Sequence, residues 1–269
     1  MSRVSVDGVG IHYEVTGFGR PVVLLHGFPD TGACWRHQVP ALVDAGFQVI
    51  VPDLRGYGDS DKPTDVAAYA LLLLAGDVLG VLDDLGVARA HVVGHDWGAA
   101  LAWVLASLVP DRVDQLGVLS VGHPSGFLRT LEQREKSWYM LLFQFEGVAE
   151  HWLSDDDWAN FRAWARHPDT DVTKRLEADG SLTPGLNYYR ANLDPQAWVG
   201  PPITLPAVTA PTMGVWSTGD MALTESQMTD SAEFVAGPWR YERVEGAGHW
   251  LQLEAPDRVN ALLVDFLER

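Results

Sequence analysis

Two hydrophobic patterns alternate along most of the chain. Apolar and polar residues alternate with a period of two at residues 4–6 and 11–15, around Asp7-Gly8, which predicts an antiparallel hairpin. Short, mainly apolar runs predict strands at residues 21–25, 48–51, 91–93, 113–121, 212–216 and 240–244. Helical patterns lie between them, at residues 32–45, 69–85, 99–106, 225–235 and 256–267. This alternation indicates an α/β fold, with a mostly parallel sheet flanked by helices.

The alternation stops between residues 127 and 205. No further strand run occurs in this segment, which is helical in pattern and dense in tryptophan. Pro201-Pro202 and Pro206 mark its end, because proline interrupts regular structure. We therefore expect a core made of residues 1–126 and 206–269, with residues 127–205 inserted as a helical cap.

The sequence Gly94-His95-Asp96-Trp97-Gly98 stands between a predicted strand and a predicted helix. Its spacing is typical of a nucleophile elbow, in which small flanking residues permit a tight turn. Asp96 occupies the position of the nucleophile. A carboxylate can displace a leaving group from saturated carbon, as in an epoxide or alkyl halide, and water must then hydrolyse the resulting ester. The alternative is that Asp96 only caps the helix.

Two more reactive side chains follow later strands. Asp220 follows residues 212–216, and His249 lies in the glycine-rich turn at residues 246–250. The chain order of nucleophile, acid and histidine is that of the α/β-hydrolase fold. We therefore expect His249, oriented by Asp220, to activate water against the ester on Asp96. Glu225 is the nearest alternative to Asp220 as the acid.

The remaining steps of this scheme need hydrogen-bond donors. The backbone N–H groups of Phe28 and Trp97 are expected to form the oxyanion hole. An epoxide oxygen, unlike a halide, also needs a proton as it leaves. Tyr139 and Tyr189, both in the predicted cap, are candidates to supply it, although aromatic side chains in such a cap commonly serve only in packing.

The amino-acid composition limits the kinds of binding partner and cofactor that we expect. The formal net charge is −17, which argues against nucleic acid and anionic membrane surfaces and slightly against anionic substrates. Cys34 is the only cysteine, so neither an internal disulfide nor a cysteine metal cluster is expected. No spacing of metal ligands stands out, and the scheme above needs neither metal nor cofactor. Without a signal-peptide pattern or a membrane-length apolar run, we expect a cytoplasmic protein, with a homodimer as one open possibility for its assembly.

These motifs resemble the α/β-hydrolase-fold epoxide hydrolases along nearly the whole chain. The matching segments are His26-Gly27-Phe28-Pro29, Asp53-Leu54-Arg55-Gly56-Tyr57-Gly58-Asp59-Ser60, Gly94-His95-Asp96-Trp97-Gly98, Phe143-Gln144 with Gly147-Val148-Ala149-Glu150, Asn187-Tyr188-Tyr189-Arg190 and Gly248-His249-Trp250. The resemblance implies conversion of an epoxide to a vicinal diol, with a cis peptide bond before Pro29. It also implies that Tyr139 and Tyr189 are the ring-opening acids.

The resemblance further suggests which residues contact the substrate: Phe28, Trp97, Met140, Tyr188 and Trp250. Met140 stands where the mammalian soluble enzymes carry Gln, so pocket contacts cannot be transferred at that position. The aromatic content favours an apolar or aryl-substituted epoxide.

Two other functions share parts of this pattern. Haloalkane dehalogenases resemble the chain at Asp96-Trp97, but they typically carry Asn where Phe28 stands. Fluoroacetate dehalogenases typically have Arg at the position of Trp97. A catalytically silent ligand-binding protein is expected to have lost part of the triad, whereas Asp96, Asp220 and His249 are all present. The sequence therefore favours epoxide hydrolysis over both.

Overall fold

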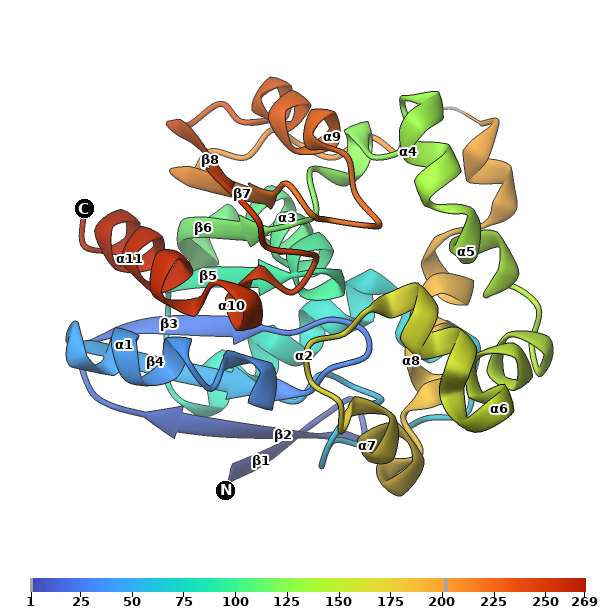
Figure 1. The fold of residues 1–269 in the computed structure, drawn as a ribbon. Helices are drawn as coiled ribbons and strands as arrows, with labels where there is room; N and C mark the ends of the chain where they lie inside the picture. The colour runs from blue at the N-terminus through green and yellow to red at the C-terminus, as the bar shows by residue number, and fades with distance from the viewer. Residues whose placement is uncertain (1, 201–202) are drawn as a thin grey trace.

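The computed structural model describes residues 2–200 and 203–269. One eight-stranded sheet runs through it in the order β1-β2-β4-β3-β5-β6-β7-β8 (Figure 1). The strands are β1 (Ser2–Val6), β2 (Val9–Thr16), β3 (Arg20–Leu25), β4 (Phe47–Pro52), β5 (Ala90–His95), β6 (Val113–Leu119), β7 (Thr212–Ser217) and β8 (Trp239–Val244). Strand β2 pairs antiparallel with β1 and β4, and all other neighbours are parallel. The predicted α/β fold is confirmed.

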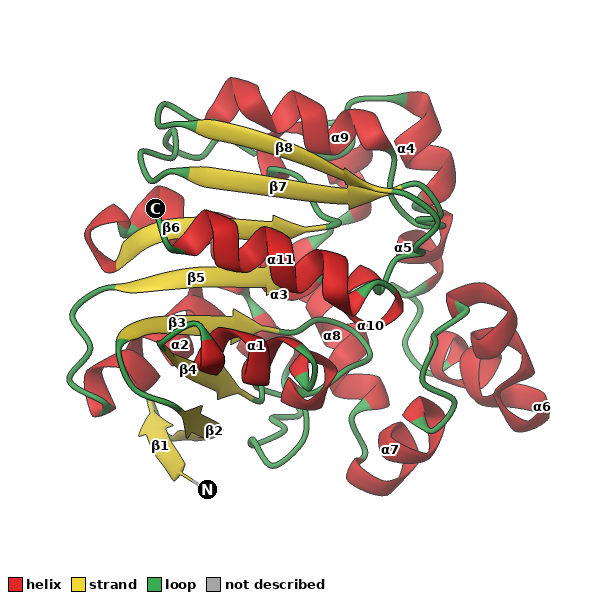
Figure 2. Cartoon of the chain, turned by 60° about the vertical axis from the view of Figure 1, so that its left-hand side comes forward, coloured by secondary structure: helices red, strands yellow, loops and turns green. Residues whose placement is uncertain are grey.

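Helices cover both faces of the sheet (Figure 2). In the core these are α1 (Gln38–Asp44), α2 (Leu71–Asp84), α3 (Trp97–Leu108), α9 (Glu225–Thr229), α10 (Leu251–Glu254) and α11 (Pro256–Leu267). Short 3-10 helices are η1 (Gly32–Trp35), η2 (Val66–Tyr69), η3 (Pro110–Arg112), η4 (Pro124–Gly126) and η6 (Asp230–Phe234). In β3, Val22 and Leu24 pack in one hydrophobic cluster, and Val23 and Leu25 pack in the other. Because successive side chains of a strand face opposite sides, a strand buried on both faces is a continuous apolar run.

Two predicted helices are broken in the structure. The segment predicted as one helix at residues 32–45 forms η1 and then α1. Pro40 is the third residue of α1, and proline is tolerated in the first turn of a helix but disrupts its interior. The second predicted helix, at residues 225–235, forms α9 followed by η6.

The chain changes direction across the sheet after β4. Strand β4 lies on one side of β3, and β5 lies on the other, with Leu25 of β3 beside Gly94 of β5. Ligands of open α/β sheets bind outside the carboxyl ends of strands at such a reversal. Phe28 follows β3 and Asp96 follows β5, so two predicted site residues meet at this place.

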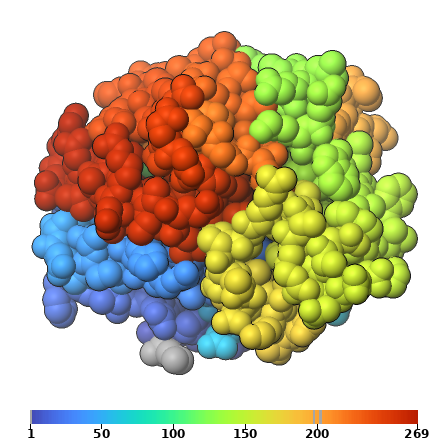
Figure 3. Space-filling view, viewed as in Figure 1, coloured from blue at the N-terminus to red at the C-terminus, as the bar shows by residue number. Residues whose placement is uncertain are grey.

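Residues 127–205, for which we keep the name cap, supply the helices that lie between η4 and β7. They are α4 (Leu131–Lys136), α5 (Trp138–Leu142), α6 (Val148–Ala165, interrupted at residues 155–158), α7 (Val172–Asp179), α8 (Leu182–Asn192) and the 3-10 helix η5 (Pro195–Trp198). They lie beyond the carboxyl ends of the strands (Figure 1), and the space-filling view shows them closing that side of the molecule (Figure 3). Pro201 and Pro202, predicted to mark the end of the cap, fall outside the described residues. No helix in the described part of the chain is long and apolar enough to cross a membrane.

Candidate active site

Asp96 occupies the sharp turn between β5 and α3. Its backbone is held at φ +53° and ψ −123°, a conformation that is strained for any residue except glycine. A Cβ atom at Gly94 would overlap the Gly98 backbone, and one at Gly98 would overlap the Leu25 carbonyl group. Both flanking glycines are therefore required by the close approach of the backbone. The turn holds the Asp96 carboxylate at the carboxyl edge of the sheet.

The two carboxylate oxygens of Asp96 have different surroundings. Oδ1 accepts a hydrogen bond of 2.8 Å from the Phe28 N–H, whereas Oδ2 lies 3.4 Å from Nε2 of His249. The Asp96 side chain makes no capping hydrogen bond to α3. This geometry does not support the alternative that Asp96 serves only as a helix cap. Trp97 begins α3, so its N–H is among the donors that a helix leaves unpaired in its first turn.

His249 is held from its other side by Asp220. The Nδ1 atom lies 2.9 Å from Oδ2 of Asp220, and Oδ1 of Asp220 accepts bonds of 2.9 Å from the N–H groups of Ala222 and Leu223. Burial alone would raise the pKa of Asp220, but His249 and these two N–H groups hold it below its usual value. Asp220 is thus an ionised carboxylate that orients the imidazole. Glu225, the alternative acid, instead accepts a hydrogen bond from the Tyr241 hydroxyl.

His249 carries a proton in this arrangement. Burial lowers the pKa of an imidazole, but the carboxylates of Asp220 and Asp96 outweigh burial here and raise the pKa of His249 to about 10. At neutral pH this raised pKa favours the imidazolium, whose ring lies between the side chains of Asp220 and Asp96.

Two residues that the sequence reasoning missed fix the backbone of His249. The His249 carbonyl oxygen accepts hydrogen bonds from Nε2 of His95, at 2.9 Å, and from Oγ of Ser120, at 3.0 Å. Burial and the neighbouring His249 lower the pKa of His95 to about 4, so His95 is neutral. The position of His95 in the elbow motif, next to Asp96, could have indicated a role for it in the site. Nothing in the sequence around Ser120 indicates its contact with His249.

Tyr139 of α5 and Tyr189 of α8 lie together at the cavity that contains Asp96. Their ring centroids are 6.0 Å apart, and their exposed fractions are 3% and 2%. Burial, followed by the nearby charge of Asp96, raises the pKa of both hydroxyls well above the usual value. Both hydroxyls therefore stay protonated at neutral pH and can donate hydrogen bonds.

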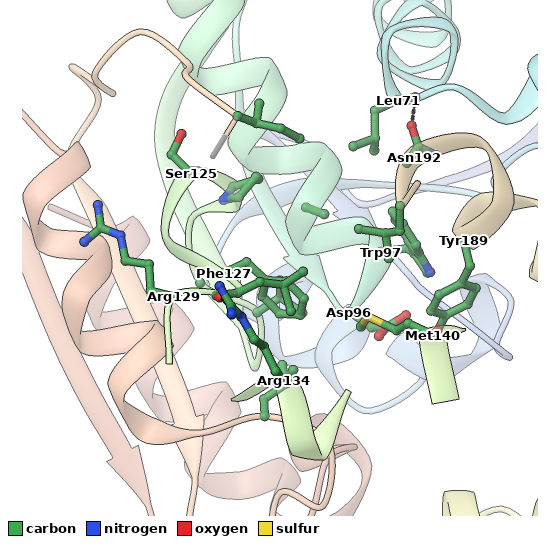
Figure 4. A pocket seen from close by; sticks show the side chains of 18 of the residues that line it. Leu71, Asp96, Trp97, Ser125, Phe127, Arg129, Arg134, Met140, Tyr189 and Asn192 are labelled. Carbon is green, nitrogen blue, oxygen red and sulfur yellow. Dashed lines mark hydrogen bonds between the residues drawn. The ribbon is translucent and has the colours of Figure 1, made fainter. Parts of the chain in front are cut away.

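Two cavities meet at these residues. The larger has a volume of about 370 Å³, and Figure 4 shows Asp96, Met140 and Tyr189 in its wall. The smaller, of about 20 Å³, also contacts His249 and has room for one water molecule. Asp96, Tyr139 and Tyr189 border both.

The predicted substrate contacts divide between these cavities, with one exception. Trp97 and Met140 border the larger cavity, and Phe28 and Trp250 border the smaller one. Tyr188 borders neither. Its ring is fully buried, and its hydroxyl donates a hydrogen bond of 2.6 Å to the Arg55 carbonyl oxygen. The expectation that Tyr188 lines the pocket is therefore corrected, since this bond turns the side chain into the core.

The described residues contain no group of three or more His, Cys, Asp or Glu side chains placed to hold a metal ion.

Comparisons with known proteins agree with this geometry. A family model described as "alpha/beta hydrolase fold" matches residues 20–256. Epoxide hydrolase A of Mycobacterium tuberculosis is 34% identical, and the match covers 97% of this chain and 96% of that protein. Epoxide hydrolase 3 of Xenopus tropicalis is 33% identical, with coverage of 99% and 77%. The crystal structure of a Bacillus megaterium epoxide hydrolase in complex with an inhibitor superposes with a TM-score of 0.90, at 28% identity and full coverage of both chains.

Proposed function

The chain belongs to the α/β-hydrolase fold family and is an epoxide hydrolase, and we propose that it opens the epoxide through a covalent ester on Asp96. The unequal surroundings of the two Asp96 oxygens carry this proposal. Oδ2, which has no backbone N–H partner among the described residues and lies 3.4 Å from Nε2 of His249, attacks an epoxide carbon, while Oδ1 stays bound to the Phe28 N–H, 2.8 Å away. Attack breaks the carbon–oxygen bond of the ring and leaves a neutral ester whose carbonyl oxygen is Oδ1.

Tyr139 and Tyr189 act on the oxygen that leaves. Both border the cavity with Asp96 and keep their protons at neutral pH. They hydrogen-bond the epoxide oxygen, and one of them transfers its proton as the ring opens. The resulting tyrosinate recovers a proton from the His249 imidazolium, which leaves His249 neutral.

Neutral His249 then activates the second step. Formation of the ester removes the charge of Asp96, one of the two carboxylates that raise the pKa of His249, and so favours the neutral imidazole. His249 takes a proton from a water molecule, and the hydroxide attacks the ester carbon of Asp96. The N–H groups of Phe28 and Trp97 stabilise the charge that develops on Oδ1. When this tetrahedral intermediate collapses, it expels the alcohol oxygen, which takes the remaining proton of the water. The diol is then released.

The hydrolytic water has a suitable place in the smaller cavity, which His249 and Asp96 both border. We further propose that the cap, residues 127–205, forms a unit separate from the core and supplies the proton donors.

The wall of the larger cavity is mainly apolar, with contributions from Leu71, Ala100, Val121, Phe127 and Leu223. This lining supports an apolar or aryl-substituted epoxide as substrate.

Product analysis tests the reaction class. Purified protein is incubated with styrene oxide or, in parallel, with 1-bromobutane, and diol and bromide are measured. We expect diol and no bromide, and an Asp96→Ala variant should form neither. Bromide without diol would instead assign a dehalogenase, with the two tyrosines serving only in packing.

A further inference from the structure

A guanidinium group borders the larger cavity without a carboxylate partner. Arg134, in α4 of the cap, is half-buried and lines the same cavity as Asp96. Its Nε donates a hydrogen bond of 2.8 Å to the Leu128 carbonyl oxygen, which fixes the orientation of the planar group. Within residues 2–200 and 203–269, this is the only hydrogen bond of the Arg134 side chain, and the side chain joins no ion pair. Two of its nitrogens are therefore left to bind a ligand.

Two other polar side chains that border this cavity are already engaged. Arg129, which also borders the cavity, pairs with Glu233 at 2.8 Å. The amide of Asn192, which also borders the cavity, bonds to backbone groups of Tyr69, Leu71 and Tyr188. Arg134 thus differs from its neighbours in having free donors in a wall that is otherwise mainly apolar.

We propose that Arg134 binds a carboxylate or similar anionic group of the substrate, so that the enzyme prefers epoxides with an apolar body and an anionic end. This inference rests on the proposed function and specifies its substrate class. Figure 4 places Arg134 on the Phe127 side of the cavity, whereas Tyr189 and Met140 lie beside Asp96. The anionic end is bound at Arg134, and the epoxide end reaches Asp96.

The distribution of charge in the cavity favours this orientation. A negative nucleophile and a positive guanidinium border one cavity, so an anionic substrate is repelled at one place and attracted at the other. Arginine offers a carboxylate two parallel N–H donors, and such charge-assisted pairs are stronger than neutral hydrogen bonds. The net charge of −17 opposes anion binding at long range, but charges separated by more than about 8 Å in water are largely screened at physiological ionic strength. The nearby charge of Arg134, rather than the net charge of the protein, therefore determines whether anionic epoxides are preferred over neutral ones.

A binding experiment tests the inference without any turnover. The affinities of 4-phenylbutyrate and of neutral 4-phenylbutyramide are measured by calorimetry for the wild type, Arg134→Gln and Arg129→Gln. We expect the wild type to prefer the carboxylate by about 10-fold or more, the scale of a lost charge-assisted hydrogen bond. Arg134→Gln should abolish this preference. Arg129→Gln changes the net charge equally, so it should retain the preference if the position of the charge matters.

Equal affinities for the two ligands in the wild type would overturn the inference. So would an equal loss of the preference for the carboxylate in Arg134→Gln and Arg129→Gln. Arg134→Lys provides a second variant if Arg134→Gln does not fold. It keeps the charge but not the planar pair of donors, so it should retain part of the preference.

Turnover separates this inference from the proposed function. The substrates are 4-(oxiran-2-ylmethoxy)benzoate and its methyl ester, and the measured quantity is the ratio of their kcat/KM values. We expect Arg134→Gln to lower the acid-to-ester ratio by about 10-fold or more. An unchanged ratio, with diol formed from both compounds, would overturn the role of Arg134 alone. Absence of diol from both would contradict the proposed function, while the binding experiment would still decide on Arg134.

Discussion

Nε2 of His249 lies 3.4 Å from Oδ2 of Asp96, so the histidine contacts the oxygen that we assign to the attack. Before the reaction, the Asp96 carboxylate favours the protonated imidazole, which cannot act as a base. Ester formation removes that charge at the moment when a base is needed. In the proposed mechanism, the contact therefore couples the state of Asp96, as nucleophile or ester, to the protonation of His249, the residue that activates water.

Replacement of His249 should separate the two chemical steps. In His249→Gln, Asp96 is still positioned by the Phe28 N–H, but no base can activate the water. We expect the ester to accumulate and steady-state turnover to fall by about 10²-fold or more, the usual range for loss of general base catalysis. Mass spectrometry of the protein after incubation with styrene oxide should show an increase equal to the whole mass of the epoxide.

Peptide mapping should place this added mass on Asp96. An Asp96→Ala, His249→Gln double variant is the control and should gain no mass. An unmodified His249→Gln protein that nevertheless lacks diol formation would contradict the two-step scheme.

The raised pKa of His249 should also appear in the pH dependence of stability. Folding raises this pKa from 6.5 to about 10, so the folded protein binds the proton more tightly than the unfolded chain. The resulting stabilisation is complete below about pH 6.5 and is lost as the pH rises through about 10. Urea unfolding at pH 7 and pH 10 should show the wild type losing on the order of 3 kcal/mol more than His249→Gln.

Asp96→Asn gives a second check on this linkage. It removes one of the two carboxylates that favour the imidazolium, so the loss of stability should be smaller than in the wild type and should be complete at a lower pH. Parallel pH profiles of the wild type and His249→Gln would rule out a strongly bound proton on His249.

The two cap tyrosines should affect ring opening, whereas their neighbour Tyr188 should affect stability. Tyr139→Phe and Tyr189→Phe each remove one donor from the cavity, and we expect each to slow single-turnover ester formation by about 10-fold or more, with a near-complete block in the double variant. Tyr188→Phe is the matched control. It removes the hydrogen bond to the Arg55 carbonyl oxygen, at a cost of about 1 kcal/mol of stability, without removing a donor from the cavity.

Rapid-quench measurement of the ester distinguishes these outcomes. If both single variants at Tyr139 and Tyr189 form ester at the wild-type rate, the two side chains serve only in packing.

The sequence was sufficient for the sheet and for the order of the reactive residues, because buried strands and the elbow leave strong local patterns. Asp96 could be identified because the glycines around it reflect a turn that few sequences permit. No local pattern of this kind shows which of Tyr188 and Tyr189 faces the cavity. Adjacent residues on a helix point about 100° apart, and which of them faces the cavity depends on how α8 packs against the core. Ser120 was missed for a similar reason, since the group that it binds, the His249 carbonyl oxygen, lies far away in the sequence. Arg134 was missed because the group that we propose it binds belongs to the substrate.

The position of Gly27 offers a test of how tightly the nucleophile is held. A Cβ atom there would overlap the Asp96 carboxylate and would approach the Trp97 nitrogen to 2.7 Å. The strained turn holds the Asp96 backbone in place, so Gly27→Ala should displace the Asp96 side chain or the loop that carries Phe28. We expect kcat/KM for styrene oxide to fall by about 10²-fold, as for other small misplacements of reacting groups. Overpacking should also cost about 1–3 kcal/mol of stability.

Gly76→Ala is the matched control for this substitution. Gly76 lies inside α2, and a Cβ atom there would have no neighbour within 4 Å. Alanine should therefore raise the free energy of unfolding by about 0.5–1 kcal/mol, because glycine weakens a helix interior, and activity should not change. Wild-type kcat/KM in Gly27→Ala would mean that the loop before Pro29 moves freely. The N–H of Phe28 could then not be the fixed donor that keeps the two oxygens of Asp96 distinct.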